Sequence, residues 1–389
     1  MKNTFRNSIM KEEELFWNQR KTGKPVIFWG CGNNAHIVKK ILECKGIYPD
    51  AFCDNNSKLW GKKFEETEVL SYAQIKQKYS QYDMLITAAV GGAVEIEKQL
   101  KEAGEKNKII HMEKPFKVDN EFLDYDYIRA NIEQFETVYE FLEDNFSKEL
   151  FVENVNFRLC GNKFPLLKYV DGESFFDSKL FHSFEEDNYV DVGAYTGDTL
   201  LRYYAFCGGK YKKIYAIEPD EENYEGLQML VKLGRLKNVE TFQCGAWECK
   251  DTLTFFTAQN KNKRNFDSPN FFKNMSETIP SSCGIEEEDF MEEKIEVNTV
   301  DNLLQGEPCG ILKINALAAD FQTLRGCKKT IQQYKPVIVG EFGTRKENLT
   351  EMLLYMKELN DNYRVFLRQK MIFGDCKTVF TAIDSGRIR

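Results

Sequence analysis

Residues 190–199 have the sequence VDVGAYTGDT, and this stretch decides the fold. The apolar residues before Gly193 predict a buried strand, the two glycines predict a tight loop, and Asp198 and Thr199 begin a helix. In a doubly wound α/β sheet, the ligand crevice opens at such a strand-to-helix turn. Gly193 and Gly197 allow the backbone to turn sharply and to approach a ligand without interference from a Cβ atom.

The next predicted strand ends in the carboxylate of Glu218, 25 positions after Gly193. An acidic side chain at this spacing accepts hydrogen bonds from both hydroxyls of a ribose. A third predicted strand ends at residues 244–247, CGAW. The combination favours a site for S-adenosylmethionine over a glycine turn and a surface glutamate in an unspecialised α/β protein. The predicted cofactor-binding residues are Asp191, Gly193, Ala194, Tyr195, Thr196, Gly197, Thr199, Glu218, Pro219, Gly245, Ala246 and Trp247.

Outward from this stretch, short apolar runs alternate with amphipathic segments in two parts of the chain, which predicts an α/β protein with two Rossmann-like doubly wound domains. The first domain is expected over residues 20–115 and the second over 166–389. Residues 116–165 have apolar side chains at three- and four-residue intervals and predict a helical bridge that acts as a spacer. The last two predicted strands have no helix between them, so the second sheet should finish in an antiparallel pair.

From about residue 119 to the end, the chain resembles the FkbM family of methyltransferases. The matching blocks include VDVGAYTGDT, YAIEPD, ILKINALAADFQTLRGC, KPVIVGEF and the YRVFLRQ…KTVFTAI ending. The resemblance implies a class I methyltransferase fold and S-adenosylmethionine as the methyl donor. It also implies O-methylation of a sugar, glycan-linked or natural-product hydroxyl.

One block departs from the family, which tends to have I-K-x-D-x-E-G-x-E. Here Asn315 stands for the first acid, Leu317 for the second, Ala318 for the glycine and Asp320 for the last acid. Two negative charges beside the expected substrate cleft are therefore lost, together with a general base or a carboxylate ligand for a cation. Two interpretations follow: a working enzyme that mainly aligns its substrate, or a non-catalytic S-adenosylmethionine or nucleotide sensor or interaction protein. The predicted catalytic residues are Lys313, Asn315 and Glu341.

Glu341 is open to two interpretations, as a contact to the substrate or as a structural partner of Lys313. Both residues are expected at the ends of adjacent strands. Because the sulfonium of S-adenosylmethionine already activates the methyl group, alignment of a hydroxyl can replace a strong base.

The first domain carries a G-x-G-x-x-A pattern in residues 30–35, GCGNNA, between a predicted strand and a helix. Asp54 ends the next strand, 24 residues after Gly30, and backbone N–H groups at the helix start can bind phosphate. Residues 24–112 resemble small Rossmann-like domains of sugar-nucleotide-modifying proteins, which implies a nucleotide or nucleotide-sugar ligand. The alternative is an empty pocket that serves as a docking surface. The predicted nucleotide-binding residues are Gly30, Gly32, Asn33, Asn34 and Asp54.

Composition narrows the classes of partner. The 389 residues carry a net charge of −8, which disfavours a nucleic-acid substrate and leaves a small molecule or a glycan. Eleven cysteines without a C-x-x-C pair, together with three histidines, predict no metal site and fit a reducing cytosol. The N-terminus lacks the apolar region of a secretory signal, so we expect a cytoplasmic protein without a membrane partner. The sequence leaves open whether the chain forms a homo-oligomer.

Overall fold

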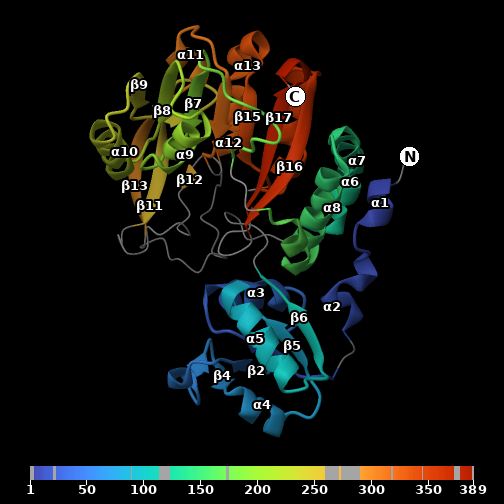
Figure 1. Ribbon diagram of the computed structural model, residues 1–389. Coiled ribbons are helices and arrows are strands. Elements are labelled where there is room, and N and C mark those ends of the chain that lie inside the picture. Colours follow the sequence, from blue (N-terminus) through green and yellow to red (C-terminus); the bar gives the residue numbers. More distant parts are fainter. Residues whose placement is uncertain are drawn as a thin grey trace.

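The computed structural model is a mixed α/β protein with two lobes. In Figure 1, the smaller lobe is drawn in blue and cyan and the larger lobe in green to red. The predicted fold class, parallel sheets with crossover helices, is confirmed. The structure describes residues 4–20, 23–88, 90–113, 123–171, 175–258, 271–272, 290–316, 319–343, 345–371 and 377–387.

The smaller lobe is a six-stranded sheet with the strand order β3-β4-β2-β1-β5-β6. Its strands are β1 (Val26–Trp29), β2 (Ala51–Cys53), β3 (Lys63–Phe64), β4 (Thr67–Leu70), β5 (Asp83–Ile86) and β6 (Lys108–His111). Its helices are α3 (Asn33–Glu43), α4 (Tyr72–Lys78) and α5 (Val90–Glu102). All neighbouring strands are parallel except β3 and β4, and the order reverses between β1 and β5. A ligand crevice is expected at that reversal.

The larger lobe is built on a seven-stranded sheet with the order β16-β17-β15-β14-β7-β8-β9. The strands are β7 (Asn188–Val192), β8 (Lys213–Ile217), β9 (Val239–Phe242), β14 (Ile311–Ile314), β15 (Val337–Glu341), β16 (Tyr363–Met371) and β17 (Lys377–Asp384). The helices are α9 (Asp198–Phe206), α10 (Glu221–Leu233), α11 (Val300–Leu304), α12 (Asp320–Arg325), α13 (Lys328–Tyr334) and α14 (Glu351–Leu359). The last two strands, β16 and β17, pair antiparallel as predicted, and the order reverses between β7 and β14.

Alternate residues of the central strands point to opposite faces of this sheet. Val190 and Val192 pack into one hydrophobic core, whereas Tyr189 packs into a second core on the other face. This alternation places Asp191 on the same face as Tyr189, beneath α9. The face of the sheet on which a side chain lies therefore decides which residues it can contact at the end of β7.

A second, four-stranded sheet with the order β10-β13-β11-β12 was not predicted. Its strands are β10 (Gly245–Ala246), β11 (Asp251–Ala258), β12 (Phe271–Phe272) and β13 (Phe290–Asn298). The prediction that residues 244–247 end the third strand of the main sheet is wrong. The chain leaves that sheet after β9, and Gly245 and Ala246 pair parallel with Val297 and Asn298 of β13.

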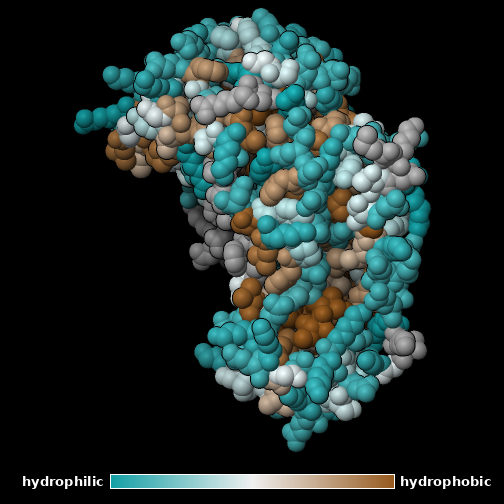
Figure 2. All heavy atoms as spheres, turned by 45° about the vertical axis from the view of Figure 1, so that its right-hand side comes forward, coloured by the Kyte–Doolittle hydropathy of each residue, from teal (hydrophilic) through white to brown (hydrophobic). Residues whose placement is uncertain are grey.

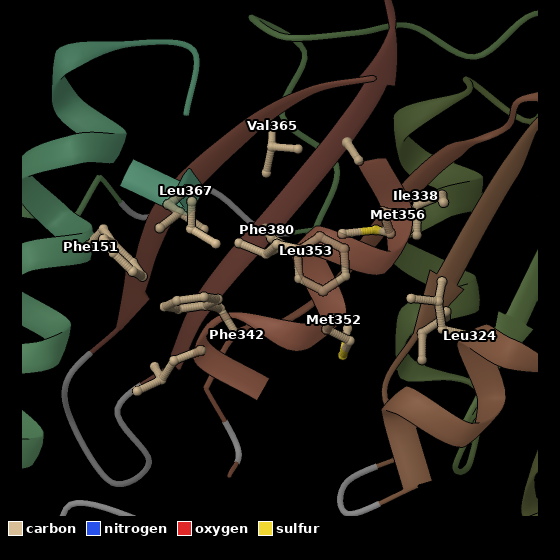
Figure 3. Close-up of a cluster of buried hydrophobic side chains, with 14 of the residues drawn as sticks. Phe151, Leu324, Ile338, Phe342, Met352, Leu353, Met356, Val365, Leu367 and Phe380 are labelled. Atoms are coloured by element: carbon tan, nitrogen blue, oxygen red, sulfur yellow. The ribbon is translucent and has the colours of Figure 1, made fainter. Parts of the chain in front are cut away.

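The bridge between the lobes consists of α6 (Tyr125–Ala130), α7 (Ile132–Phe141) and α8 (Asn145–Cys160). It is not a simple spacer, because α8 packs along β16. The ring of Phe151 lies 6.0 Å from the ring of Phe342, and in Figure 3 it extends toward Phe342 and Leu367. Asp144 at the start of α8 forms an ion pair of 2.7 Å with Arg368 of β16. The bridge therefore belongs to the hydrophobic core of the larger lobe.

The chain's first described residues also pack on the bridge. Phe5 of α1 (Thr4–Ser8) is buried against Phe135 and Phe151. Short helices η1 (Glu12–Glu14) and α2 (Phe16–Gln19) then lead to the smaller lobe. Figure 2 shows this side of the molecule, with hydrophobic side chains gathered in a recess of its lower half.

Two contacts join the end of β6 to the end of α8 and the following segment. Lys163, 2% exposed, forms a 2.5 Å ion pair with Glu113, and the ring of His111 lies tilted against that of Phe164 with a centroid separation of 3.8 Å. In the described part of the chain, no helix is long and apolar enough to cross a membrane.

Candidate functional site

The loops after β7 and β14 meet where the strand order of the larger sheet reverses. The backbone N–H of Asn315 donates to the carbonyl of Val192 (3.1 Å), and the N–H groups of Gly193 and Ala194 donate to the carbonyl of Ile217 (3.0 Å each). Gly193 has a φ of +71°, and a Cβ atom there would lie 2.0 Å from the carbonyl oxygen of Asn315. Glycine is therefore required first by the packing of the two loops, so a larger side chain here would disturb the fold itself.

Glu218 holds the glycine loop in place at the end of β8. Its Oε2 accepts a hydrogen bond from the backbone N–H of Tyr195 (2.9 Å), and its Oε1 accepts one from the N–H of Asp220 (3.1 Å). The side chain is 6% exposed, and burial raises the pKa of its carboxyl above the ordinary value, while these hydrogen bonds oppose the rise. A carboxylate has about four lone-pair positions, so Glu218 keeps acceptor capacity for a ligand.

Beneath the loop lies a buried ion pair between neighbouring strands. Lys313 of β14 stands opposite Asp191 of β7 in the parallel register, and its Nζ lies 2.9 Å from Asp191 Oδ1; both side chains are 0% exposed. The same ammonium donates to the carbonyls of Val192 (3.0 Å) and Gly193 (2.8 Å), while Thr199 donates to Asp191 Oδ2 (2.8 Å). These contacts fix the end of β7, the loop and the start of α9 relative to one another.

The predicted roles of three of these residues therefore need correction. Lys313 is not placed to act as a catalytic residue, because its ammonium is enclosed and all three of its donors have acceptors. Asp191 and Thr199 are likewise buried partners of this network and do not face a ligand. All three are positioning residues for the glycine loop.

Glu341, at the end of β15, pairs with a residue that the sequence did not indicate. Its Oε1 lies 2.8 Å from Nζ of Lys377 at the start of β17, and the two side chains are 7% and 18% exposed. The interpretation of Glu341 as the partner of Lys313 is wrong, since Lys313 pairs with Asp191 instead. Glu341 remains near the carboxyl edge of the sheet but is already engaged in an ion pair.

Asn315 follows β14 directly and carries the most distinctive polar atom of the site. Its Oδ1 is buried and has no hydrogen-bond partner in the described part of the chain. Asp320, 0% exposed, accepts a hydrogen bond from the N–H of Ala316 (2.6 Å) and so closes the loop that follows. The predicted positions Leu317 and Ala318 lie outside the described residues.

The remaining predicted cofactor residues are divided between two places. Tyr195 has a φ of +52° and is 38% exposed, and Pro219 is half-buried beside Glu218. Ala194 and Gly197 are buried, Gly197 where α9 meets Leu230 of α10. Gly245 and Ala246 lie in the second sheet, and Trp247, which follows them, packs in a buried cluster with Leu253, Ile295, Val297 and Ala319. Because only 8% of Trp247 is exposed, its side chain serves to pack this cluster.

Comparison with known families shows what this lobe is similar to. Residues 191–364 match the family model described as the Methyltransferase FkbM domain. This part of the larger lobe is therefore similar to the FkbM methyltransferase domain. The prediction of a methyltransferase is thereby confirmed, with the glycine loop, Glu218 and Asn315 all at or inside the matched region.

One solved structure supports the fold over nearly the whole chain. A crystal structure of methyltransferase FkbM from Methylobacillus flagellatus KT matches with a TM-score of 0.67 and 17% identity, covering 93% of this chain and 91% of that chain. A putative methyltransferase from Streptococcus mutans in complex with SAH matches 54% of this chain and 93% of that chain, with 16% identity and a TM-score of 0.29. A comparison with curated proteins found no match.

The smaller lobe matches a different family model and repeats the geometry of the larger lobe. Residues 22–110 match the model described as C2185-like, N-terminal. Asp54 at the end of β2 accepts hydrogen bonds from the N–H of Cys31 (3.0 Å) in the glycine loop and from the N–H of Asn56 (2.8 Å). Glu218 makes the same two contacts, to the loop and to the residue two positions onward. In both lobes, the strand-end carboxylate therefore holds the glycine loop.

The predicted nucleotide-binding residues of the smaller lobe lie around this loop. Gly30 has a φ of +119°, and a Cβ atom there would meet the backbone of Ala88 after β5. Gly32 has open space around it and precedes Asn33 and Asn34, the first residues of α3. The geometry brings these residues together at the strand-order reversal.

Sequence reasoning missed two lysines at the carboxyl edge of the FkbM domain, Lys370 near the end of β16 and Lys377 at the start of β17. Both lie where the chain passes from β16 to β17, and because β17 runs antiparallel to β15, this end of the pair lies at the same edge as the ends of the parallel strands. That topological argument could have found them.

Among the described residues, no cluster of three or more His, Cys, Asp and Glu side chains is placed to hold a metal ion.

Proposed function

We propose that the chain uses S-adenosylmethionine to methylate a hydroxyl group of a sugar, a glycan-linked substrate or a natural product. The observation that carries the proposal is the loop at the strand-order reversal, tied by Glu218 through the N–H of Tyr195, within an FkbM methyltransferase domain. Open α/β sheets bind ligands at this position, outside the carboxyl ends of the strands.

The residues at this edge fit the cofactor. Glu218 has lone pairs left for ribose hydroxyls after accepting its protein hydrogen bonds. Oδ1 of Asn315 is a buried acceptor without a partner among the described residues, as expected for an atom that awaits a donor from a ligand. When bound, S-adenosylmethionine supplies a methyl group that its sulfonium already activates.

The work left to the protein is alignment. Lys313 and Glu341 are both held in ion pairs, and Asn315 has no titratable group, so none of the three predicted catalytic residues is placed as a strong base. The amide oxygen of Asn315 can orient an acceptor hydroxyl by accepting its hydrogen bond. Holding two reacting groups in register lowers the barrier substantially even without proton transfer in the protein.

Substitution of Asn315 tests this function. At saturating acceptor, transfer by the wild type should become faster as the pH rises, because the acceptor hydroxyl must lose its proton without a strong base. Asn315→Asp adds an ionisable acceptor and should raise the rate, by up to ~10²–10⁴ where general-base catalysis is fully expressed. The measurement is transfer of labelled methyl to a panel of sugar and natural-product hydroxyls, with Asn315→Ala as the control that removes the acceptor atom. If the wild type and Asn315→Asp bind S-adenosylhomocysteine but transfer nothing, the sensor interpretation replaces hydroxyl methylation.

For the smaller lobe, we propose a nucleotide or nucleotide-sugar ligand at the loop of residues 30–34. The proposal is supported by Asp54, which retains acceptor capacity for ribose hydroxyls, and by the start of α3, where backbone N–H groups favour phosphate. A panel of nucleotides and sugar nucleotides should raise the unfolding temperature of the wild type, and Asp54→Ala should abolish that rise. If no compound gives a rise that depends on Asp54, the lobe is a docking module.

A further inference from the structure

A group of charged side chains lies at the carboxyl edge of the FkbM domain, beside the loops assigned to the cofactor. It contains three cations and two anions from four elements. Its members are Arg202 and Asp198 of α9, Glu341 of β15, Lys370 of β16 and Lys377 of β17. None of them was used in the proposed function, apart from Glu341 as an engaged ion-pair partner.

Lys370 occupies an irregular position in the closing strand pair. The register of β16 against β17 shifts between Gln369, opposite Thr378, and Met371, opposite Lys377, so Lys370 is the extra residue. Such β-bulges re-aim a side chain and are common beside active sites. The ammonium of Lys370 lies 4.7 Å from the centroid of Phe175, and the same buried ring lies 5.9 Å from Nζ of Lys313 beneath the glycine loop. Lys370 therefore reaches back from the outermost strand of the sheet toward the cofactor loop.

The charge around Lys370 is not balanced. Its side chain is half-buried, and among the described residues no carboxylate lies within 4.0 Å of its ammonium. The carboxylate of Glu341 on β15, which could compensate the charge of Lys370, is already paired with Nζ of Lys377 at 2.8 Å. Burial, followed by the positive charges of Arg202 and Lys377, lowers the pKa of Lys370 to about 8, while Glu341 and Asp198 oppose this shift. A negatively charged ligand group would stabilise the protonated ammonium of Lys370 against both its burial and the repulsion by the neighbouring positive charges.

We propose that this edge binds an oxyanion of the methyl acceptor, a phosphate or a carboxylate, through Lys370, with Arg202 adding positive charge. The inference rests on the proposed function, and it narrows the acceptor from hydroxyl compounds in general to anionic ones. The face of Phe175 stabilises the ammonium on one side by a cation–π contact, which leaves its other sides for the ligand. An acceptor anchored here by its charged group would present a hydroxyl toward Asn315.

Sulfate and acetate serve as probes, since neither changes its charge between pH 7 and 9.5. Sulfate represents a phosphate group and acetate a carboxylate, so their relative affinities distinguish the two. Calorimetry on the full chain should show binding that weakens above pH 8, as Lys370 loses its proton. Lys370→Met keeps an unbranched side chain of similar length beside Phe175 and removes one of three like charges, so it should fold; we expect it to bind at least tenfold more weakly. Arg364→Gln, at the far end of the same strand, is the matched control and should bind as the wild type does.

Two outcomes overturn the inference. One is anion binding that is equal in wild type and Lys370→Met, or absent in both. The other is complete displacement of the anion by S-adenosylhomocysteine, which would assign the charges to the carboxylate of the cofactor. Failure of the proposed function is a separate result, namely that S-adenosylhomocysteine itself does not bind. Retained sulfate or acetate binding in the presence of S-adenosylhomocysteine supports an acceptor site.

Discussion

Lys313→Met should lower the free energy of unfolding of the larger lobe by about 3–5 kcal/mol, as expected when one partner of a buried ion pair is removed. The substitution leaves the carboxylate of Asp191 fully buried, with Thr199 as its remaining side-chain partner. It also removes the donor to the carbonyls of Val192 and Gly193. Denaturant-induced unfolding of the wild type and the variant measures the difference.

A double variant separates the charge effect from lost packing. Asp191→Leu combined with Lys313→Met removes both charges, and replacement of a buried pair by apolar groups is often neutral or stabilising. We therefore expect the double variant to recover most of the stability lost in Lys313→Met. A loss below about 1 kcal/mol in the single variant, typical of a surface pair, would contradict a buried role for this lysine.

Glu218→Ala should raise the dissociation constant for S-adenosylhomocysteine at least tenfold. Hydrogen bonds to a charged group contribute about 1.5–3 kcal/mol each, and the variant loses those to ribose. It also releases the N–H of Tyr195, which positions the loop that approaches the ligand. Calorimetric titration with S-adenosylhomocysteine gives both dissociation constants.

Two further variants make this measurement specific. Glu218→Gln keeps one oxygen that can accept from Tyr195, so it should weaken binding less than Glu218→Ala. Asp54→Ala removes the equivalent carboxylate of the smaller lobe and should leave the affinity for S-adenosylhomocysteine unchanged. An unaltered dissociation constant in Glu218→Ala would place the adenosine elsewhere.

The fold and the centre of the site could be predicted because their signals are local. The apolar runs that become β7 and β8, the glycines at 193 and 197 and the strand-end Glu218 all lie within one stretch of chain. The absence of a helix between the last two strands likewise predicted their antiparallel pairing. In each case, the residues that carry the pattern are neighbours in sequence.

The parts that were missed depend on contacts between distant residues. The Lys313–Asp191 pair depends on the register of β14 against β7, which cannot be read from the sequence of either strand. The partner of Glu341 likewise depends on the register of β17 against β15. The second sheet arises because Gly245 and Ala246 pair with β13, some fifty residues later in the chain. The bridge was taken for a spacer because the periodicity of a helix indicates an apolar face but not what that face packs against.

The most direct measurement is a crystal structure of the full chain with S-adenosylhomocysteine bound. We expect the ligand at the reversal between β7 and β14, with its ribose hydroxyls on Glu218 and its sulfur end toward Asn315. Density for the ligand at the loop of Gly30 and Asp54, or no bound ligand at a concentration that saturates other methyltransferases, would contradict the assignment of this site to S-adenosylmethionine.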